Sequence, residues 1–201
     1  MATATKTPSP TNGSSRPTGG TGRSAGGSQS GAGEATLPRS FDHSVCVFWL
    51  GTQCYGLQSS MVGEVFLVES RVPVPVAPAP VVGLFNLRGT PVALVDLAQV
   101  LDLPDAAAMA PPVADRTLLA LVLRTDTVTV GVHIRKMEAV LPAGRALYHA
   151  PDAAGCEHPA VAGFLELPDR PELTITLLER QEVLTRLARL RYRDVEEDEG
   201  A

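Results

Sequence analysis

The residues that could carry chemistry are scattered through this sequence. Its four histidines stand apart, at His43, His133, His149 and His158. The sequence contains no glycine loop of the phosphate-binding type, no Gly-x-Ser-x-Gly nucleophile elbow and no His-Glu-x-x-His zinc motif. Because no nucleophile, base or phosphate cradle is recognisable, we expect no catalytic residues, and a non-catalytic interaction protein becomes the leading interpretation.

The cysteines do not indicate a metal or cofactor site. Cys46, Cys54 and Cys156 lack ligand-like spacing, and an odd number of cysteines without a signal peptide fits a reduced, cytoplasmic protein. Cys156 and His158 are two possible ligands on one loop, too few for a structural zinc site. We expect no metal, no cofactor and, because no apolar run reaches about 18 residues, no membrane-spanning segment.

Composition divides the chain into a polar arm, a globular body and an acidic end. Residues 1–40 consist almost wholly of Gly, Ser, Thr, Pro and Ala, which predicts a disordered N-terminal tail. The body extends over 41–193, and residues 194–201 form an acidic C-terminal tail. The arginines before that tail suit a solvated helix end, and without interleaved aromatic residues they do not indicate nucleic-acid binding.

Short apolar runs separated by turn residues indicate an all-β body. Arg88-Gly89-Thr90 predicts a hairpin turn, because Gly89 is free to adopt positive φ. Residues 143–159 are predicted to be a long loop, and apolar residues at helical spacing predict a helix over 179–193. The expected strands lie at 45–50, 54–57, 62–68, 82–87, 91–95, 118–123, 128–132, 137–141, 162–167 and 173–178.

The two halves of the body contain a diverged repeat. Gly56 precedes Val62 at the spacing at which Gly131 precedes Met137, and Gly83-Leu84 matches Gly163-Phe164 later in each half. We infer two copies of a five-strand unit, with lobe one at about 45–101 and lobe two at about 117–184. Small units of this kind usually close into barrels, and packing two together supplies the burial that each would lack alone.

The segment 83–97 resembles the signature of the CheW-like family. It combines Gly-Leu-Phe-Asn-Leu-Arg-Gly with a short strand that ends in Val-Asp-Leu. Other matches follow in the family's order, at 48–51, 55–57, 62–65, 75–80, 131–132 and 175–178, so that the resemblance covers about 45–187. It implies two interlocked five-stranded SH3-like barrels, to which the sequence adds the C-terminal helix.

The resemblance also implies a function. Members of the family couple chemoreceptor cytoplasmic hairpins to the regulatory domain of a CheA-type histidine kinase. The chain carries no kinase, phosphotransfer or receiver module, so it is similar to the stand-alone coupling protein, which is cytoplasmic and recruited to receptor arrays. Ala98, Arg135-Lys136 and Glu179 depart from the family pattern. The alternative is therefore a diverged CheW-like module for localisation or array recruitment that does not activate kinase.

The family motifs suggest a partner-binding surface. Arg88 precedes a glycine turn, so its guanidinium should project from the surface. It either binds carboxylates or carbonyls of a partner, or forms a local salt bridge to Glu64 or Asp96. The expected partner-binding residues are Trp49, Val62, Glu64, Leu84, Asn86, Arg88 and Gly89.

Three apolar members of this surface have alternative interpretations. Val62 and Leu84 either line an apolar groove between the lobes, where partner helices would bind, or belong to the ordinary core. Trp49 alternates along its strand with Phe48 and Leu50, which we expect to point inward. Its ring is either an interface anchor or packs under the neighbouring lobe.

Overall fold

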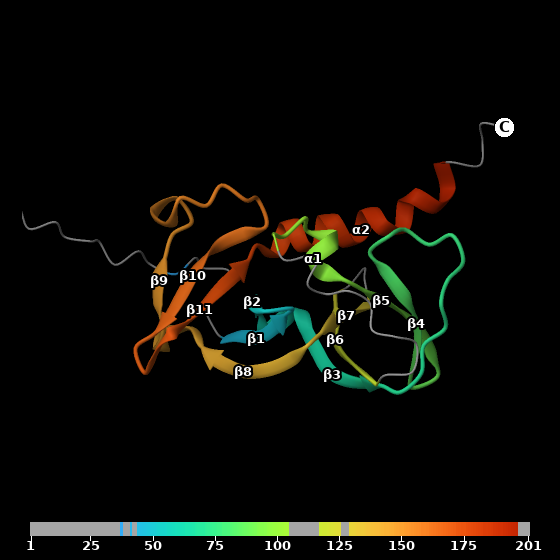
Figure 1. The fold of residues 1–201 in the computed structure, drawn as a ribbon, viewed down its shortest axis with the longest axis horizontal. Coiled ribbons are helices and arrows are strands. Elements are labelled where there is room, and N and C mark those ends of the chain that lie inside the picture. The colour runs from blue at the N-terminus through green and yellow to red at the C-terminus, as the bar shows by residue number, and fades with distance from the viewer. Residues whose placement is uncertain (1–36, 38–40, 42–43, 105–116, 126–128, 197–201) are drawn as a thin grey trace, which may run out of the picture. The chain divides into compact units, whose positions relative to one another are not determined.

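The computed structural model describes Leu37, Phe41 and residues 44–104, 117–125 and 129–196 (Figure 1). The predicted N-terminal tail lies outside the described residues apart from Leu37, and so do residues 197–201. Leu37 packs against a buried cluster that contains Phe41, which is fully buried.

The described residues form mainly β-strands. The helices are α1 (Leu97–Val100) and α2 (Arg180–Glu196), with short 3-10 turns η2 (Ser59–Met61), η4 (Ala143–Arg145) and η5 (Asp152–Ala154). The strands are β1 (Ser44–Leu50), β2 (Gln53–Gln58), β3 (Val62–Val68), β4 (Val81–Leu87), β5 (Thr90–Val95), β6 (Leu118–Arg124), β7 (Thr129–Ile134), β8 (Lys136–Pro142), β9 (Leu147–His149), β10 (Val161–Leu167) and β11 (Arg170–Leu178).

Two boundaries differ from the sequence-based expectation. The predicted long loop at 143–159 contains β9, a strand of three residues that is too short to show an alternating pattern. The predicted acidic tail begins inside α2, which continues to Glu196 because no Gly or Pro interrupts the helix before that point.

The strands form two sheets, and each sheet takes strands from both halves of the chain. Sheet A has the order β8-β1-β2-β11-β10-β9, and sheet B has the order β3-β6-β7-β5-β4. The all-β fold of two interlocked barrels is therefore confirmed, although sheet A gains a sixth strand from β9. Neither sheet coincides with one of the contiguous lobes at about 45–101 and 117–184, because the first two strands of each half pair in the other half's sheet.

The repeat inferred from sequence appears directly in this topology. If β1, β2, β3, β4 and β5 are exchanged with β6, β7, β8, β10 and β11, the order of sheet B becomes that of sheet A without β9. The parallel pairs β5–β7 and β11–β2 are counterparts, and both β4 and β10 shift register at a glycine, Gly83 or Gly163. The two halves therefore use the same pairing scheme.

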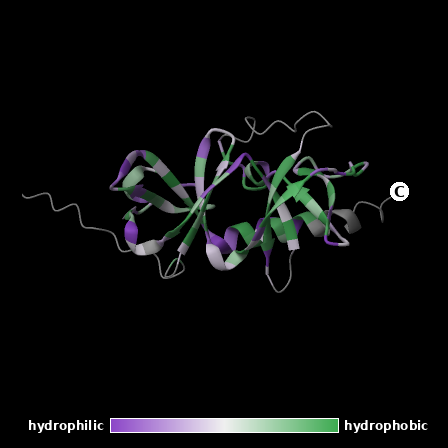
Figure 2. Ribbon diagram, turned by 90° about the horizontal axis from the view of Figure 1, so that it is seen from below, coloured by the Kyte–Doolittle hydropathy of each residue, from purple (hydrophilic) through white to green (hydrophobic). Residues whose placement is uncertain are grey.

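Three apolar clusters hold the sheets together. One fills the interior of the barrel formed by sheet A (barrel A), and another fills the interior of the barrel formed by sheet B (barrel B). The third lies between the sheets and includes Phe48 and Leu121, together with Val183 and Leu187 of α2. Hydrophobic residues accordingly predominate along the strands (Figure 2). The predicted apolar stripe of the C-terminal helix is confirmed as core packing.

Gly163 provides a test of the close packing of β10 against β9. Its φ is +146°, and a Cβ would lie 2.6 Å from the carbonyl oxygen of His149 and would overlap the Tyr148 ring. We expect Gly163→Ala to lower the free energy of unfolding by about 3 kcal/mol, because strain and overpacking combine. Gly144→Ala is the control, because no atom lies within 4 Å of its added Cβ. Equal denaturation midpoints for the two variants would contradict this packing.

Candidate partner-binding surface

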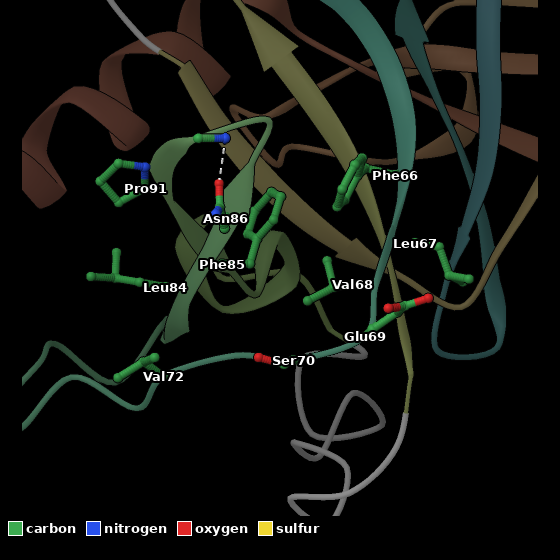
Figure 3. A pocket seen from close by; sticks show the side chains of 11 residues that line it. Phe66, Leu67, Val68, Glu69, Ser70, Val72, Leu84, Phe85, Asn86 and Pro91 are labelled. Atoms are coloured by element: carbon green, nitrogen blue, oxygen red, sulfur yellow. Dashed lines mark hydrogen bonds between the residues drawn. The ribbon is translucent and has the colours of Figure 1, made fainter.

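The signature motif forms the tight hairpin between β4 and β5. Leu87 and Thr90 are paired across the hairpin, which leaves Arg88 and Gly89 as a two-residue loop. Both have positive φ, +52° and +93°, as a type I′ turn requires. The Gly89 N–H donates a hydrogen bond of 2.6 Å to Oδ1 of Asn86 (Figure 3). Asn86 and Gly89 thus fix the turn that presents Arg88.

The Arg88 side chain forms a local ion pair on the surface. Its Nη2 lies 2.7 Å from Oε2 of Glu64, and 73% of the arginine side chain is exposed. The other carboxylate oxygen of Glu64 lies 3.3 Å from Nη2 of Arg124, at the end of β6. Of the two local acids that the sequence offered, Glu64 is therefore the partner of Arg88.

Asp96, the other acid, has a structural role. It is buried and stands at the N-cap of α1, where its carboxylate accepts hydrogen bonds from the backbone N–H groups of Ala98 and Gln99 and from the Gln99 side chain. A capping carboxylate satisfies helix donors that would otherwise lack partners. The Val-Asp-Leu part of the motif thus builds the fold beneath the surface.

An apolar groove of about 680 Å³ lies beside the hairpin, at the seam between the edge strands β3 and β4 of sheet B (Figure 3). The rings of Phe66 and Phe85 meet in it with centroids 5.7 Å apart. The isolated bridge between Val72 and Leu84 crosses the seam next to β4. The remaining lining residues are Leu67, Val68, Glu69, Ser70, Asn86, Gly89 and Pro91.

The groove unites some of the expected site residues and excludes others. Leu84 lines it together with Asn86 and Gly89, whereas Val62 packs against the cluster between the sheets. Val62 thus corresponds to the second alternative, the ordinary core, whereas Leu84 lines the groove at the edge of sheet B. β3 changes register between Val62 and Glu64. The side chains before and after this shift therefore do not alternate between the two faces of the sheet without interruption.

Trp49 lies on sheet A and packs under residues of the second half. Its ring contacts the interior cluster of barrel A, which includes Leu165 and Ile175. Its Nε1 donates a hydrogen bond of 2.9 Å to Oε2 of Glu138. This geometry corresponds to the second alternative for Trp49, packing against the neighbouring lobe. Phe48 is fully buried on the opposite face of β1, as expected.

Glu138 is the centre of a polar cluster that the sequence did not reveal. Besides the indole of Trp49, it binds Nζ of Lys136 at 2.7 Å and Nη1 of Arg170 at 2.9 Å. The Glu138 side chain is only 12% exposed. Hydrogen bonds from Lys136, Arg170 and the indole lower the pKa of this carboxyl to about 2.

The repeat relates this cluster to the ion pairs around Glu64. The spacing of Gly56 and Gly131 equates Trp49 with Arg124 and Glu138 with Gly63. The strand pairings agree, because both sheets have their register shift at this point. Each barrel thus joins a glutamate on its third strand to an arginine at its hairpin. Aligning the halves through these glycines would have pointed to Arg124 as the counterpart of Trp49, and to Glu138 only as a neighbour in the alignment of Glu64.

The described residues contain no group of three or more His, Cys, Asp or Glu side chains that could hold a metal ion. The imidazole Nδ1 of His158 instead accepts a hydrogen bond from the backbone N–H of Ala160. Burial raises the pKa of Cys46 to about 11 and, with the charge of Glu138, that of Cys54 to about 12, so both thiols stay protonated at neutral pH.

Within the described part of the chain, no helix combines the length and the apolar character needed to cross a membrane. The helices there, α1 and α2, pack through apolar residues against the cluster between the sheets.

Comparisons with known proteins identify the family. The family model for the CheW-like domain matches residues 44–186. The chain belongs to the CheW-like domain family. Among solved structures, the scaffolding protein TtCheW from Thermoanaerobacter tengcongensis is similar, with a TM-score of 0.51 and 20% sequence identity. That match covers 69% of this chain and 85% of TtCheW, and it supports the fold. A comparison with curated proteins gave no match.

The Glu138 cluster predicts a specific dependence of stability on pH. Because the pKa of Glu138 falls from 4.5 to about 2 on folding, its stabilising effect is complete above pH 4.5 and is lost as the pH falls towards 2. Glu138→Gln should lower the free energy of unfolding by about 2 kcal/mol at pH 7. Urea denaturation of wild type and variant should show this difference shrinking over that interval.

The control is Glu172→Gln, because Glu172 also lies near Arg170 but has a side chain that is 73% exposed. Exposed ion pairs contribute little, so this change should alter stability by less than about 0.5 kcal/mol. A pH-independent difference between wild type and Glu138→Gln would show that the cluster does not stabilise the ionised carboxylate.

Proposed function

We propose that this CheW-like protein is a non-catalytic adaptor that couples chemoreceptor cytoplasmic hairpins to the regulatory domain of a CheA-type histidine kinase. In this role it acts in the cytoplasm and is recruited to receptor arrays. Membership of the CheW-like domain family supports the general role. The observation that carries the proposal is the display of Arg88 by the signature hairpin.

The hairpin does not need an arginine for its own stability. A type I′ turn favours Asn or Asp before Gly, because these residues adopt positive φ at lower cost. Arg88 occupies this position at φ +52°, and its ion pair with Glu64 is exposed. Exposed ion pairs contribute about 0–1 kcal/mol, so the pair does little more than offset the cost of the backbone conformation. Recognition of a partner accounts for the residue better than folding does.

The surroundings of Arg88 suit a protein partner. The apolar groove begins at Asn86 and Gly89, and its lining includes exposed apolar residues, with Leu67 at 54% and Val72 at 64% exposure. A charged anchor beside an apolar groove matches the way in which amphipathic helices are recognised. Of the other expected residues, Val62 packs in the cluster between the sheets, and Trp49 packs in barrel A, away from this groove.

Replacing Arg88 by Asn separates binding from folding. Arg88→Asn creates the preferred Asn-Gly turn, so stability should remain unchanged or rise by about 0.5 kcal/mol. Binding to a purified kinase regulatory domain or receptor hairpin from the same genome should weaken by about tenfold or more, as for an arginine at an interface centre. Isothermal titration calorimetry and urea denaturation measure the two effects.

The control is Arg145→Asn, which also removes one positive charge, at an exposed position in η4. This variant should bind as wild type does. If folded wild-type protein binds neither partner, the coupling function is wrong. Binding without stimulation of a reconstituted kinase would instead support the alternative of array recruitment. If Arg88→Asn binds as tightly as wild type, the signature hairpin is not the contact.

A further inference from the structure

In each barrel a polar cluster joins a glutamate on the third strand to an arginine of the last hairpin, and the two clusters differ in solvent exposure. In barrel A, the carboxylate of Glu138 is 12% exposed and the position related by the repeat to Arg124 holds Trp49, whose indole donates a hydrogen bond without adding charge. In barrel B, Glu64 is 22% exposed and lies between Arg88 and Arg124. The cluster of barrel B is therefore the more solvent-exposed of the two, and we call it the open cluster.

The open cluster has an excess of positive charge. One carboxylate, Glu64, serves two guanidinium groups, which are 73% and 51% exposed. The local charge is therefore +1, on a chain whose formal net charge is −5. The contact of Arg124 is the longer of the two, at 3.3 Å against 2.7 Å for Arg88. A second carboxylate could bind both arginines without breaking the short pair.

A β-bulge at Gly63 positions the Arg124 side chain within this cluster. The register shift between Val62 and Glu64 leaves Gly63 as an extra residue on β3. The stem of Arg124 lies across this glycine, because an added Cβ would be 3.1 Å from Cδ and 3.3 Å from Cγ of the arginine. A glycine in the bulge thus gives the arginine a path toward Glu64, and a side chain there would displace it.

We propose that Arg124 is a second recognition residue, and that Arg88 and Arg124 together bind an acidic side chain on the helical hairpin of the receptor. This inference rests on the proposed coupling function and further specifies that the partner carries a negative charge at the contact. A receptor helix can present an acidic residue and, one turn away, apolar residues on the same face. The arginine pair and the adjacent apolar groove match that combination, which makes the receptor hairpin the occupant of this surface.

The test measures binding of the full-length protein to a purified receptor hairpin fragment at increasing NaCl concentration. Arg124→Glu should weaken binding about tenfold at low salt and reduce the dependence on salt, because an attractive charge becomes repulsive. Gly63→Ala keeps every charge but moves the stem of Arg124, so binding should weaken about threefold. Arg189→Glu, the same charge change at an exposed site on α2, should stay within twofold of wild type.

The outcomes separate this inference from the function on which it rests. If wild type binds the receptor hairpin and Arg124→Glu binds no more weakly than Arg189→Glu, the inference is wrong and the coupling function stands. The inference is also wrong if Arg124→Glu weakens binding only to the kinase regulatory domain, measured in parallel. If wild type binds neither partner, both proposals fail. Thermal denaturation of each variant establishes that it is folded.

Discussion

The apolar layer between the two sheets is the constraint on which the rest of the structure depends. β1 and β6 are buried on both faces: Val45 and Val47 point into barrel A, while Cys46 and Phe48 point into the shared layer. A strand with two buried faces contributes to two cores at once. Each barrel alone would be too small for a sufficient core, so the shared layer supplies burial that neither could obtain separately.

The two barrels that share this layer differ in their polar clusters. Both barrels carry a glutamate on the third strand and an arginine at the hairpin, yet the surroundings of the two glutamates differ. Around Glu138, an indole and two cations close the site and hold the carboxylate ionised. Around Glu64, the side chains of Arg88 and Arg124 remain exposed. The two barrels thus contain polar clusters that differ in exposure, with the Glu138 side chain 12% exposed and the Glu64 side chain 22% exposed.

Local features of the fold were predictable from sequence, because they depend on neighbouring residues. The Arg88-Gly89 turn and the amphipathic α2 follow from backbone preference and periodicity. The exchange of strands between sheets was not predictable from either, because pairing joins residues far apart in the chain. The same limit hid the contact of Glu64 with Arg124, which are 60 residues apart, and left the two alternatives for Val62 undecided.

The exchange of strands bears on how an adaptor of this kind would work. β3 pairs with β6 and β5 pairs with β7, so neither half of the chain contains a complete sheet. The barrels should therefore unfold together as one cooperative unit. An adaptor must hold two partners in a fixed relation, and two independently folding lobes on a linker would not do so. The interlocked topology supplies that rigidity through the same shared layer that makes the barrels stable.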